Sequence, residues 1–433
     1  MPQEHVPPTL IVSRVFQDGR LAEIVYSREH RRTMLAVHAN GDTQLLDEVE
    51  GSGGDRFTAV PASNSLIKHE ALLFPERSDP YGDVPHLVAD IEEYFDRYVS
   101  LSPWFRRLAA YYVLFTWVYD AFEELPYLRI QAEWGSGKTR ALIVIGSLCY
   151  RAFFASGAST VSPIFHTLDT FRSTLILDEA DFRFSDQTAE LTKILNNGNV
   201  RGFPVFRTAF TNKREFDPRA FQVFGPKVVA MRKGFDDEAL ESRFITERID
   251  RVTMRSDIPI NLPPAQREEA QAFRNKLLQY RFDYRLRVHV DESCLDGALS
   301  PRTNQIISPL LSIVPDEAAR AEIRDGLRTV ELDRAKAKST SVEADVLGIV
   351  LKMSTTEGDK PLAVGEIAAS FIASHGADFD RPVTSRYIGS ILRGRLGLVT
   401  YKTHGSYMVA ADPRRLKALA SRYGCAPEAK YSP

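Results

Sequence analysis

Residues 131 to 139 read Gln-Ala-Glu-Trp-Gly-Ser-Gly-Lys-Thr and directly follow the apolar run Tyr-Leu-Arg-Ile at 127 to 130. A small residue, four variable residues and then Gly-Lys-Thr are typical of a phosphate-binding loop between a strand and a helix. Consecutive amides of such a loop surround a phosphate, and the positive dipole end of the helix adds to the attraction. The stretch therefore predicts a nucleotide-binding α/β domain.

The side chains of this loop have separate expected roles. Lys138 would reach the β- and γ-phosphates of ATP, and the hydroxyl of Thr139 would bind Mg²⁺. Ala132 stands where the pattern usually has its first glycine, so the tight turn depends on the later glycines. The predicted cofactors are ATP and Mg²⁺. The predicted nucleotide-binding residues are Ala132, Gly135, Ser136, Gly137, Lys138 and Thr139.

A second acidic segment follows the loop, with the sequence Ser-Thr-Leu-Ile-Leu-Asp-Glu-Ala-Asp at 173 to 181. Its apolar residues predict a buried parallel strand that ends in two carboxylates, at the sheet edge where ligands of open α/β sheets bind. Phosphoryl transfer needs a metal clamp and a positioned nucleophile. We therefore expect Asp178 to orient Mg²⁺ and Glu179 to polarise the attacking water.

With these two segments the chain resembles the AAA+ family of P-loop ATPases over roughly residues 125 to 335. The Ser-Arg-Phe sequence around Arg243 is similar to the arginine-finger segment of the minichromosome-maintenance helicases. The resemblance implies that Arg243 enters the ATP site of a neighbouring subunit, where it neutralises charge in the transition state. It also implies a homo-oligomer, with a hexameric ring as the expected form.

Two further segments compare differently with this family. Ser-Pro-Arg-Thr-Asn-Gln at 300 to 305 is similar to the start of the sensor-2 helix, which implies that Arg302 contacts the γ-phosphate. The strand expected at 228 to 232 ends in Met231 or Arg232, where the family commonly has Asn, so no sensor-1 residue is assigned. A surface salt bridge is the alternative role for Arg243 and for Arg302.

The stretch Leu-Asn-Asn-Gly-Asn at 195 to 199, followed by Arg201, is similar to P-loop proteins of phages and integrated mobile elements. A ribbon is expected to follow it, formed by residues 202 to 207 and 211 to 216. Ring helicases commonly have a hairpin here that faces the pore, and basic residues on it follow the phosphate backbone. An ordinary surface loop fits equally well. The predicted DNA contacts of the ribbon are Arg207, Lys213 and Arg214.

The C-terminal part of the chain is locally basic. From Arg381 to Ala418 there are eight Lys or Arg residues and one acid, Asp412. Helical patterns at 342 to 353, 364 to 372 and 384 to 392 precede a hairpin, an order that predicts a winged helix whose third helix enters the major groove of DNA. Docking on a protein is the alternative. The predicted DNA contacts are Arg386, Arg393, Arg395, Lys402 and His404.

The first eighty residues contain short strand-like runs with turns at Asp18-Gly19 and Asn40-Gly41, which predict a small β-rich domain. The expected fold is therefore α/β, with an AAA+ P-loop core and helical lid between this domain and the winged helix. The predicted parts are a β-rich domain over 1–80, a helical linker over 81–125, the ATPase core and lid over 126–338, and the winged helix over 339–433.

Composition limits the other possibilities. The chain has 433 residues, 44% of them hydrophobic, with a net charge of −2 and three scattered cysteines. Such cysteines favour a reducing compartment and neither a disulfide framework nor a zinc site. The N-terminus has no secretory signal pattern, and no apolar run approaches the length of a membrane span. A cytoplasmic protein is expected.

The predicted function is a ring-forming DNA helicase or replication initiator of a bacterial mobile element or phage, which hydrolyses ATP. A DNA-binding ATPase switch, or a defence-associated ATPase without unwinding activity, is the first alternative. A protein-remodelling ATPase is the second, because Phe203 and Phe206 would suit an aromatic threading loop. In a helicase, removing the charges of Arg207, Lys213 and Arg214 should abolish translocation and spare basal hydrolysis, which separates it from the switch. DNA stimulation of the hydrolysis rate separates both of these from the protein-remodelling ATPase.

Overall fold

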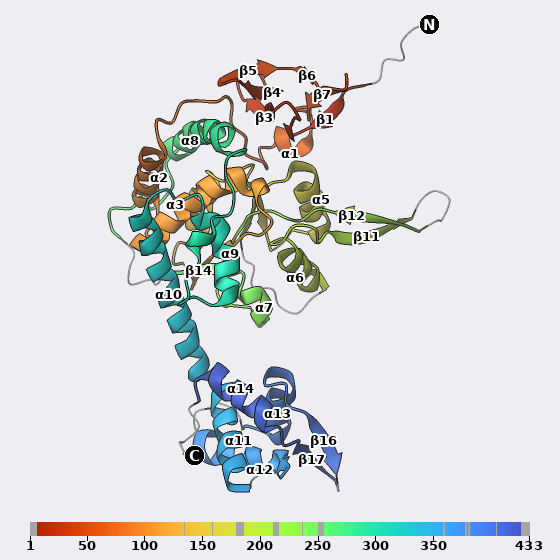
Figure 1. Ribbon diagram of the computed structural model, residues 1–433, viewed down its shortest axis with the longest axis vertical. Helices are drawn as coiled ribbons and strands as arrows, with labels where there is room; N and C mark the ends of the chain where they lie inside the picture. Colours follow the sequence, from red (N-terminus) through yellow and green to blue (C-terminus); the bar gives the residue numbers. More distant parts are fainter. Residues whose placement is uncertain are drawn as a thin grey trace. The chain divides into compact units, whose positions relative to one another are not determined.

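The computed structural model (Figure 1) has two compact units, residues 1–327 and 328–433, which are described separately below. Within the described ranges, no helix combines the length and the apolar character that crossing a membrane requires. The structure describes residues 7–133, 135–157, 159–178, 186–210, 216–235, 237–249, 255–357, 360–376, 379, 382–403 and 405–425.

The first unit is built round a five-stranded parallel sheet in the order β14-β8-β13-β10-β9. Nearly all residues of the inner strands are buried, as expected for parallel strands covered on both faces. The predicted α/β class with a parallel sheet is thus confirmed. The strands are β8 (Tyr127–Ala132), β9 (Phe153–Ser156), β10 (Leu175–Asp178), β13 (Lys227–Met231) and β14 (Phe244–Ile249).

The path of the chain through this sheet sets the place of a ligand. From β8 it crosses to the edge strand β9, returns through β10 and β13 toward β8, and then passes to β14 on the other side of β8. Strand order thus changes direction at β8, and ligands of open α/β sheets bind outside the carboxyl ends of the strands at such a point. Strand β13 separates β8 from β10, the two strands whose ends carry the predicted ATP-site residues.

Helices cover the sheet. Helix α3 (Pro103–Val118) is apolar on nearly all sides and buried from Leu108 to Val118, so it is a core element. The hydroxyl of its Tyr112 donates to the carbonyls of Pro126 and Lys227, just before or at the start of two central strands.

The other helices of the unit are α1 (Ser65–Lys68), α2 (Val84–Tyr98), α4 (Lys138–Gly146), α5 (Val161–Phe171), α6 (Asp186–Asn197), α7 (Glu238–Glu241), α8 (Ala265–Tyr284) and α9 (Pro301–Leu311), with short turns η1 (Tyr119–Ala121) and η3 (Glu292–Cys294). Helix α10 (Glu317–Ser339) continues from the first unit into the second, and strands β11 (Val205–Phe210) and β12 (Phe216–Phe221) form an antiparallel hairpin (Figure 1).

The N-terminal segment is β-rich, as its sequence predicts. An antiparallel sheet β2-β3-β4-β5 lies beside a small sheet β1-β7-β6. Asn40 and Gly41 have φ of 51° and 88°, which suits the tight turn between β4 and β5. These strands share one hydrophobic core with the helices and the parallel sheet. The strands are β1 (Thr9–Ile11), β2 (Ser13–Val15), β3 (Leu21–Ser27), β4 (Arg32–Ala39), β5 (Asp42–Leu46), β6 (Glu48–Glu50) and β7 (Arg56–Ala59).

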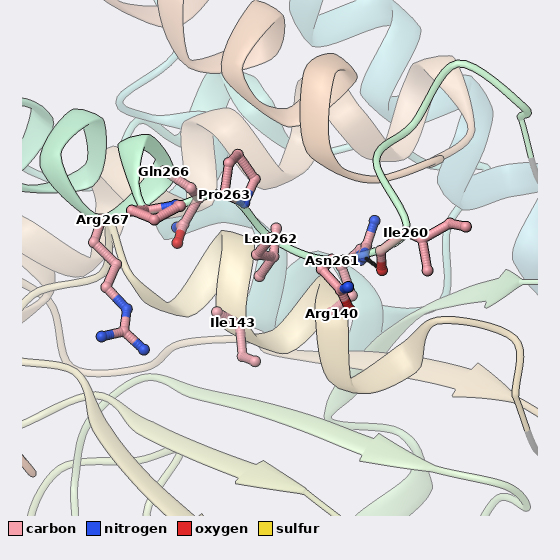
Figure 2. Close-up of a pocket in the computed structure, with 9 residues that line it drawn as sticks. Arg140, Ile143, Ile260, Asn261, Leu262, Pro263, Gln266 and Arg267 are labelled. Carbon is pink, nitrogen blue, oxygen red and sulfur yellow. Dashed lines mark hydrogen bonds between the residues drawn. The ribbon is translucent and has the colours of Figure 1, made fainter.

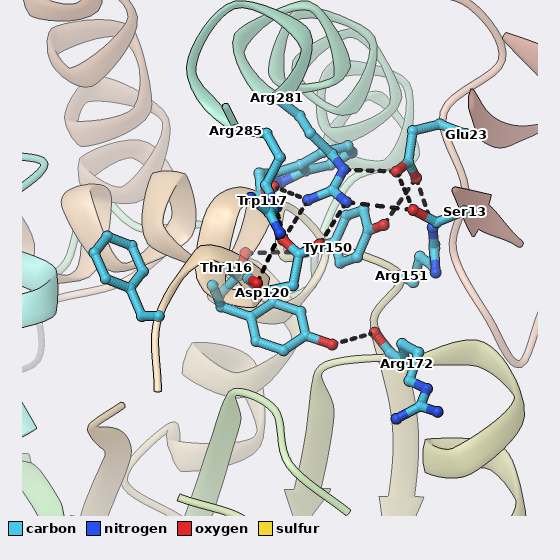
Figure 3. Close-up of polar contacts among 12 residues, drawn as sticks. Ser13, Glu23, Thr116, Trp117, Asp120, Tyr150, Arg151, Arg172, Arg281 and Arg285 are labelled. Carbon is cyan, nitrogen blue, oxygen red and sulfur yellow. Dashed lines mark hydrogen bonds and ion pairs between the residues drawn. The ribbon is translucent and has the colours of Figure 1, made fainter. Parts of the chain in front are cut away.

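A buried ion network joins β3 to α8 and to Arg151, which follows α4 (Figure 3). The Glu23 carboxylate, 1% exposed, accepts from Arg281 Nε at 2.6 Å and pairs with Arg151. Arg281 also pairs with Asp120 at 2.8 Å. Burial opposes ionisation of Glu23, but the charges of Arg281 and then Arg151 outweigh it and hold the pKa of Glu23 below its usual value. The network therefore stays ionised at neutral pH.

The second unit has its own hydrophobic core. Three helical segments precede a hairpin, in the order predicted from the sequence, and the third continues beyond α13 as a π-helical turn, η5. Strand β15 adds to the hairpin and makes a three-stranded sheet. The last helix, α14, was not predicted from the sequence, although its buried residues Leu416, Leu419 and Tyr423 have helical spacing. The elements are α11 (Val342–Glu357), β15 (Leu362–Ala363), α12 (Val364–His375), α13 (Ser385–Ser390), η5 (Ile391–Arg395), β16 (Thr400–Thr403), β17 (Ser406–Val409) and α14 (Pro413–Tyr423).

Candidate functional site

The loop between β8 and α4 has the backbone of a phosphate-binding turn. Gly135 and Gly137 have φ of 72° and 90°, a left-handed conformation that glycine adopts without strain. Ser136 is buried, and its hydroxyl donates to the carbonyl of Glu133, which holds the turn closed. Helix α4 begins at Lys138, so this residue and the first amides of the helix face the same end of the sheet.

The two residues predicted to bind the metal lie in contact. Thr139 Oγ1 donates to Asp178 Oδ2 at 2.7 Å, although the two residues come from segments separated by strand β13. Asp178 is the last residue of β10, and its carbonyl accepts from the Gly157 amide at 2.9 Å. A hydroxyl and a carboxylate are hard oxygen ligands, so the pair fits Mg²⁺, which binds few protein oxygens and keeps several waters. Glu179, the predicted base, lies outside the described residues.

A cavity of about 570 Å³ adjoins the same helix (Figure 2). The Arg140 guanidinium donates to the carbonyls of Pro259 and Ile260, which ties α4 to the segment before α8. Arg140 immediately follows Thr139, and Ile143 lies further along the helix by about 1.5 Å per residue. This cavity was not predicted from the sequence, although the apolar and proline-rich run at 258 to 264 forms part of its wall. The lining residues are Arg140, Ile143, Ile260, Asn261, Leu262, Pro263, Pro264, Gln266 and Arg267.

Arg243 and Arg302 lie at the opposite end of the strands, where the parallel strands begin. This end is called the amino edge below, and the end with the phosphate-binding loop is called the carboxyl edge. Arg243 precedes the first residue of β14, and its carbonyl accepts from the amide of Tyr127, the first residue of β8. Strand β8 has six residues, so at about 3.3 Å per residue the two edges are roughly 17 Å apart. Arg243 is therefore too far from the phosphate-binding loop of its own chain to contact a nucleotide there.

The two arginines are close enough to influence one another. Burial and then the charge of Arg302 lower the pKa of Arg243. Arg243 Nε donates to Asn199 Oδ1 at 2.8 Å, and Arg302 donates to Gln305 Oε1 at 2.6 Å. Neither side chain forms an ion pair with a carboxylate among the residues that the structure describes. Two neighbouring cations of this kind make a positive site at the amino edge of the sheet.

The two described arginines of the β11–β12 hairpin, Arg207 and Arg219, have different surroundings. Arg207 pairs with Glu190 at 2.6 Å and lies over the ring of Phe165, so it is held inside the unit. Its cross-strand neighbour Arg219 is exposed and lies 4.9 Å from the ring of Phe221. Lys213 and Arg214 fall outside the described residues. Arg219 was missed because proline precedes it and no basic run marks it.

The described DNA contacts predicted in the second unit have exposed side chains. Arg386, Arg393 and Lys402 are exposed, and Arg393 also lies 5.5 Å from the ring of Tyr407 in the hairpin. Arg395 pairs with Glu343 of α11. His404 lies outside the described residues. Helix α14 adds exposed basic residues that the sequence analysis did not assign, namely Arg414, Arg415, Lys417 and Arg422.

Comparison with known proteins found distant similarity only. No protein-family model and no curated protein sequence matches the chain. The apo NrS-1 C-terminal region is 11% identical with a TM-score of 0.36, over 90% of this chain and 96% of that chain. SCCmec type IV Cch, described as an active helicase, is 10% identical with a TM-score of 0.38, over 98% and 96%. Cdc6p from Pyrobaculum aerophilum is 11% identical with a TM-score of 0.21, over 75% and 94%. Because these identities and TM-scores are low, a function for the chain has to be inferred from its own residues.

Proposed function

We propose that the protein is a Mg²⁺-dependent ATPase that forms a ring and acts on DNA as a helicase or replication initiator of a mobile element or phage. The observation that carries the proposal is the division of the site between the two sheet edges. Lys138, Thr139 and Asp178 are at the carboxyl edge, and Arg243 and Arg302 are at the amino edge. Two protomers arranged head to tail would bring the two halves together, and such heterologous contacts form a ring when the rotation between protomers closes.

In this assignment each group has one chemical task. Lys138 and the loop amides bind the phosphates, while Thr139 and Asp178 hold the metal. Mg²⁺, when bound, would neutralise charge on the β- and γ-phosphates. Glu179 takes a proton from the attacking water, and Arg243 of the next protomer stabilises the charge that develops on the transferred group. Hydrolysis then depends on assembly.

We assign the cavity beside α4 to the nucleobase, because a nucleotide whose phosphates lie at Lys138 extends along this helix. Leu262 and the prolines supply an apolar wall, and Asn261 supplies an amide for the edge of the base. The amide nitrogen of Gln266 instead donates to the hydroxyls of Tyr94 and Ser147.

This assignment predicts the effect of a charge in the cavity. Ile143→Asp should weaken ATP binding by about 10-fold, because a carboxylate would be desolvated against the base. Titration of a fluorescent ATP analogue measures the dissociation constant. Leu10→Asp, a change at a leucine that is 57% exposed on β1, is the matched control and should bind normally. Equal affinities for both variants would show that the base does not bind in this cavity.

The DNA-binding part of the proposal rests on the second unit and the hairpin. Three helices followed by a hairpin correspond to a winged helix, and exposed Arg386, Arg393 and Lys402 would contact the phosphates or bases of duplex DNA. The hairpin between β10 and β13 would contact single-stranded DNA. A DNA-bound ATPase that assembles without unwinding uses the same residues and is the alternative.

The hairpin makes a sharper prediction than the sequence did. Arg219→Ala should weaken single-stranded DNA binding and lower the salt slope by about 0.7, the value for one lost phosphate contact on a single strand. Arg207→Ala should instead lower thermal stability, because it leaves Glu190 without this partner. Fluorescence anisotropy at several salt concentrations measures the DNA binding of both variants, and thermal melting measures their stability. If Arg207→Ala alone changes the salt slope, the assignment of the two arginines is reversed.

The rate of ATP hydrolysis with and without single-stranded and forked DNA tests the proposal as a whole. Lys138→Ala is the blank, since it lacks the amine that binds the phosphates. Stimulation by DNA together with strand separation supports the helicase, and stimulation without separation supports the switch. A rate that ignores DNA contradicts both and directs attention to protein substrates.

A further inference from the structure

The turn at 195 to 199 is fixed to the first residues of the central strands. The carbonyl of Leu195 accepts from the hydroxyl of Tyr127 at 3.0 Å. The carbonyl of Asn199 accepts from the amide of Leu125, also at 3.0 Å. Asn199 itself is fully buried. The turn that ends α6 is therefore a rigid part of the amino edge of the sheet.

Glycine is required within this turn because a buried lysine fills the space beside it. The amino group of Lys227 donates to the carbonyls of Val223 at 3.0 Å and Gly225 at 2.9 Å, and lies 3.4 Å from the carbonyl of Gly198. A Cβ atom on Gly198 would lie 2.3 Å from Lys227 Nζ and 2.5 Å from the Val223 carbonyl. No other residue fits this position without displacing the start of β13.

The rigid turn presents one amide to Arg243. Asn199 Oδ1 accepts from Arg243 Nε at 2.8 Å, and the guanidinium also donates to the carbonyl of Ala239. Since Arg Nε only donates, the amide oxygen and not its nitrogen faces the arginine. The Nδ2 group of Asn199 is buried and has no hydrogen-bond partner among the described residues. Such an unpaired group costs stability and calls for an explanation.

The same turn also holds the helix before Arg243. Asn196 Nδ2 lies 3.4 Å from Asp237 Oδ2, and the other carboxylate oxygen of Asp237 caps α7 by accepting from Ala239. On the other side of α7, Glu241 pairs with Arg129 of β8. Contacts with α7 and with the turn after α6 therefore fix the position of Arg243, and the pair between Glu241 and Arg129 fixes α7 against β8.

We propose that Asn199 is a positioning residue for Arg243, an inference that depends on the proposed role of Arg243 in a neighbouring ATP site. A neutral amide orients the guanidinium but leaves its charge available to the γ-phosphate. A carboxylate in the same place would orient it equally well and neutralise it. This requirement explains an amide at 199 even though half of its hydrogen-bonding capacity is unused.

Asn199→Asp separates this role from a structural one, because the substitution keeps the shape of the side chain and adds only charge. The variant should bind ATP normally, unfold at about the wild-type temperature and hydrolyse ATP roughly 100-fold more slowly, a part of the effect of losing the arginine. Asn197→Asp, in the same turn but without a contact to Arg243 among the described residues, is the control. It should hydrolyse ATP at the wild-type rate.

Mixing provides the second readout. Added Lys138→Ala protein supplies an intact Arg243 to the ATP site of an Asn199→Asp protomer, so hydrolysis should return. A variant that is merely misfolded would gain nothing from mixing, and that result would overturn the inference. A wild-type rate for Asn199→Asp alone would also overturn it. If Arg243→Ala hydrolyses ATP normally, the proposed function fails first, and the two failures are thereby distinguished.

Discussion

Mixing Arg243→Ala protein with Lys138→Ala protein is expected to restore ATP hydrolysis that neither variant has alone. Each variant should lose activity by roughly 1,000-fold or more, since an arginine finger contributes at least that factor in related phosphoryl transfers. In a mixed ring, the loop of an Arg243→Ala protomer meets the intact arginine of a Lys138→Ala protomer. About a quarter of the interfaces in a random equal mixture have this composition in a head-to-tail ring.

The expectation follows from the register of the central strands. Tyr127 and Phe244 are paired at one end of the parallel pair β8 and β14, and Ala132 and Ile249 are paired at the other. Arg243 and the phosphate-binding loop are thereby fixed at opposite ends of the strands, so the proposed site needs residues from two chains. The hydrolysis rate at fixed total protein, measured against the mixing ratio, checks this. A flat response at the level of the separate variants would mean that Arg243 acts within its own chain or not at all.

Replacing Glu23 by Gln is expected to lower the free energy of unfolding by about 3 to 5 kcal/mol, the usual cost of removing one partner from a buried ion pair. Arg151 and Arg281 are 1% exposed and would keep only Asp120 as a nearby countercharge in this network. Chemical denaturation measures the loss. Glu48→Gln is the matched control, because Glu48 forms an exposed pair with Arg56 at 3.3 Å.

The same substitution should alter the response to acid. The folded pKa of Glu23 is depressed, so its stabilisation is complete above the unfolded pKa of about 4.3 and disappears as the pH falls through the lower folded value. Wild-type protein should therefore lose stability below pH of about 4.5 more steeply than Glu23→Gln. Parallel curves for the two proteins would show that folding leaves the pKa of Glu23 unchanged.

The sequence predicted those parts of the site that short local patterns encode. The loop ending in Lys138 and Thr139 needs glycines at fixed offsets, and the strand ending in Asp178 is a run of apolar residues. Both patterns are complete within nine residues or fewer, so no tertiary information was required. The contact between Thr139 and Asp178 follows once the strands lie in one parallel sheet.

Pairings between distant segments could not be predicted in this way. Asn199 contacts Arg243 only because α6 ends where β14 begins, and the stretch at 195 to 199 was identified by similarity without a physical reason. Glu23 was also missed, although a carboxylate within the apolar strand 21 to 27 is itself a sign of a buried partner. Its arginines lie far along the chain, beyond the reach of any pattern in one segment.

The Glu23 network has a consequence for how this chain can be recombined with others. A gene fusion that replaced the first strands with a foreign N-terminal segment would leave the buried side chains of Arg151 and Arg281 without their carboxylate. Only a donor segment with an acid at the same place would be accepted. Exchange of the N-terminal strands is therefore expected to require a matching exchange of the arginines that pair with Glu23.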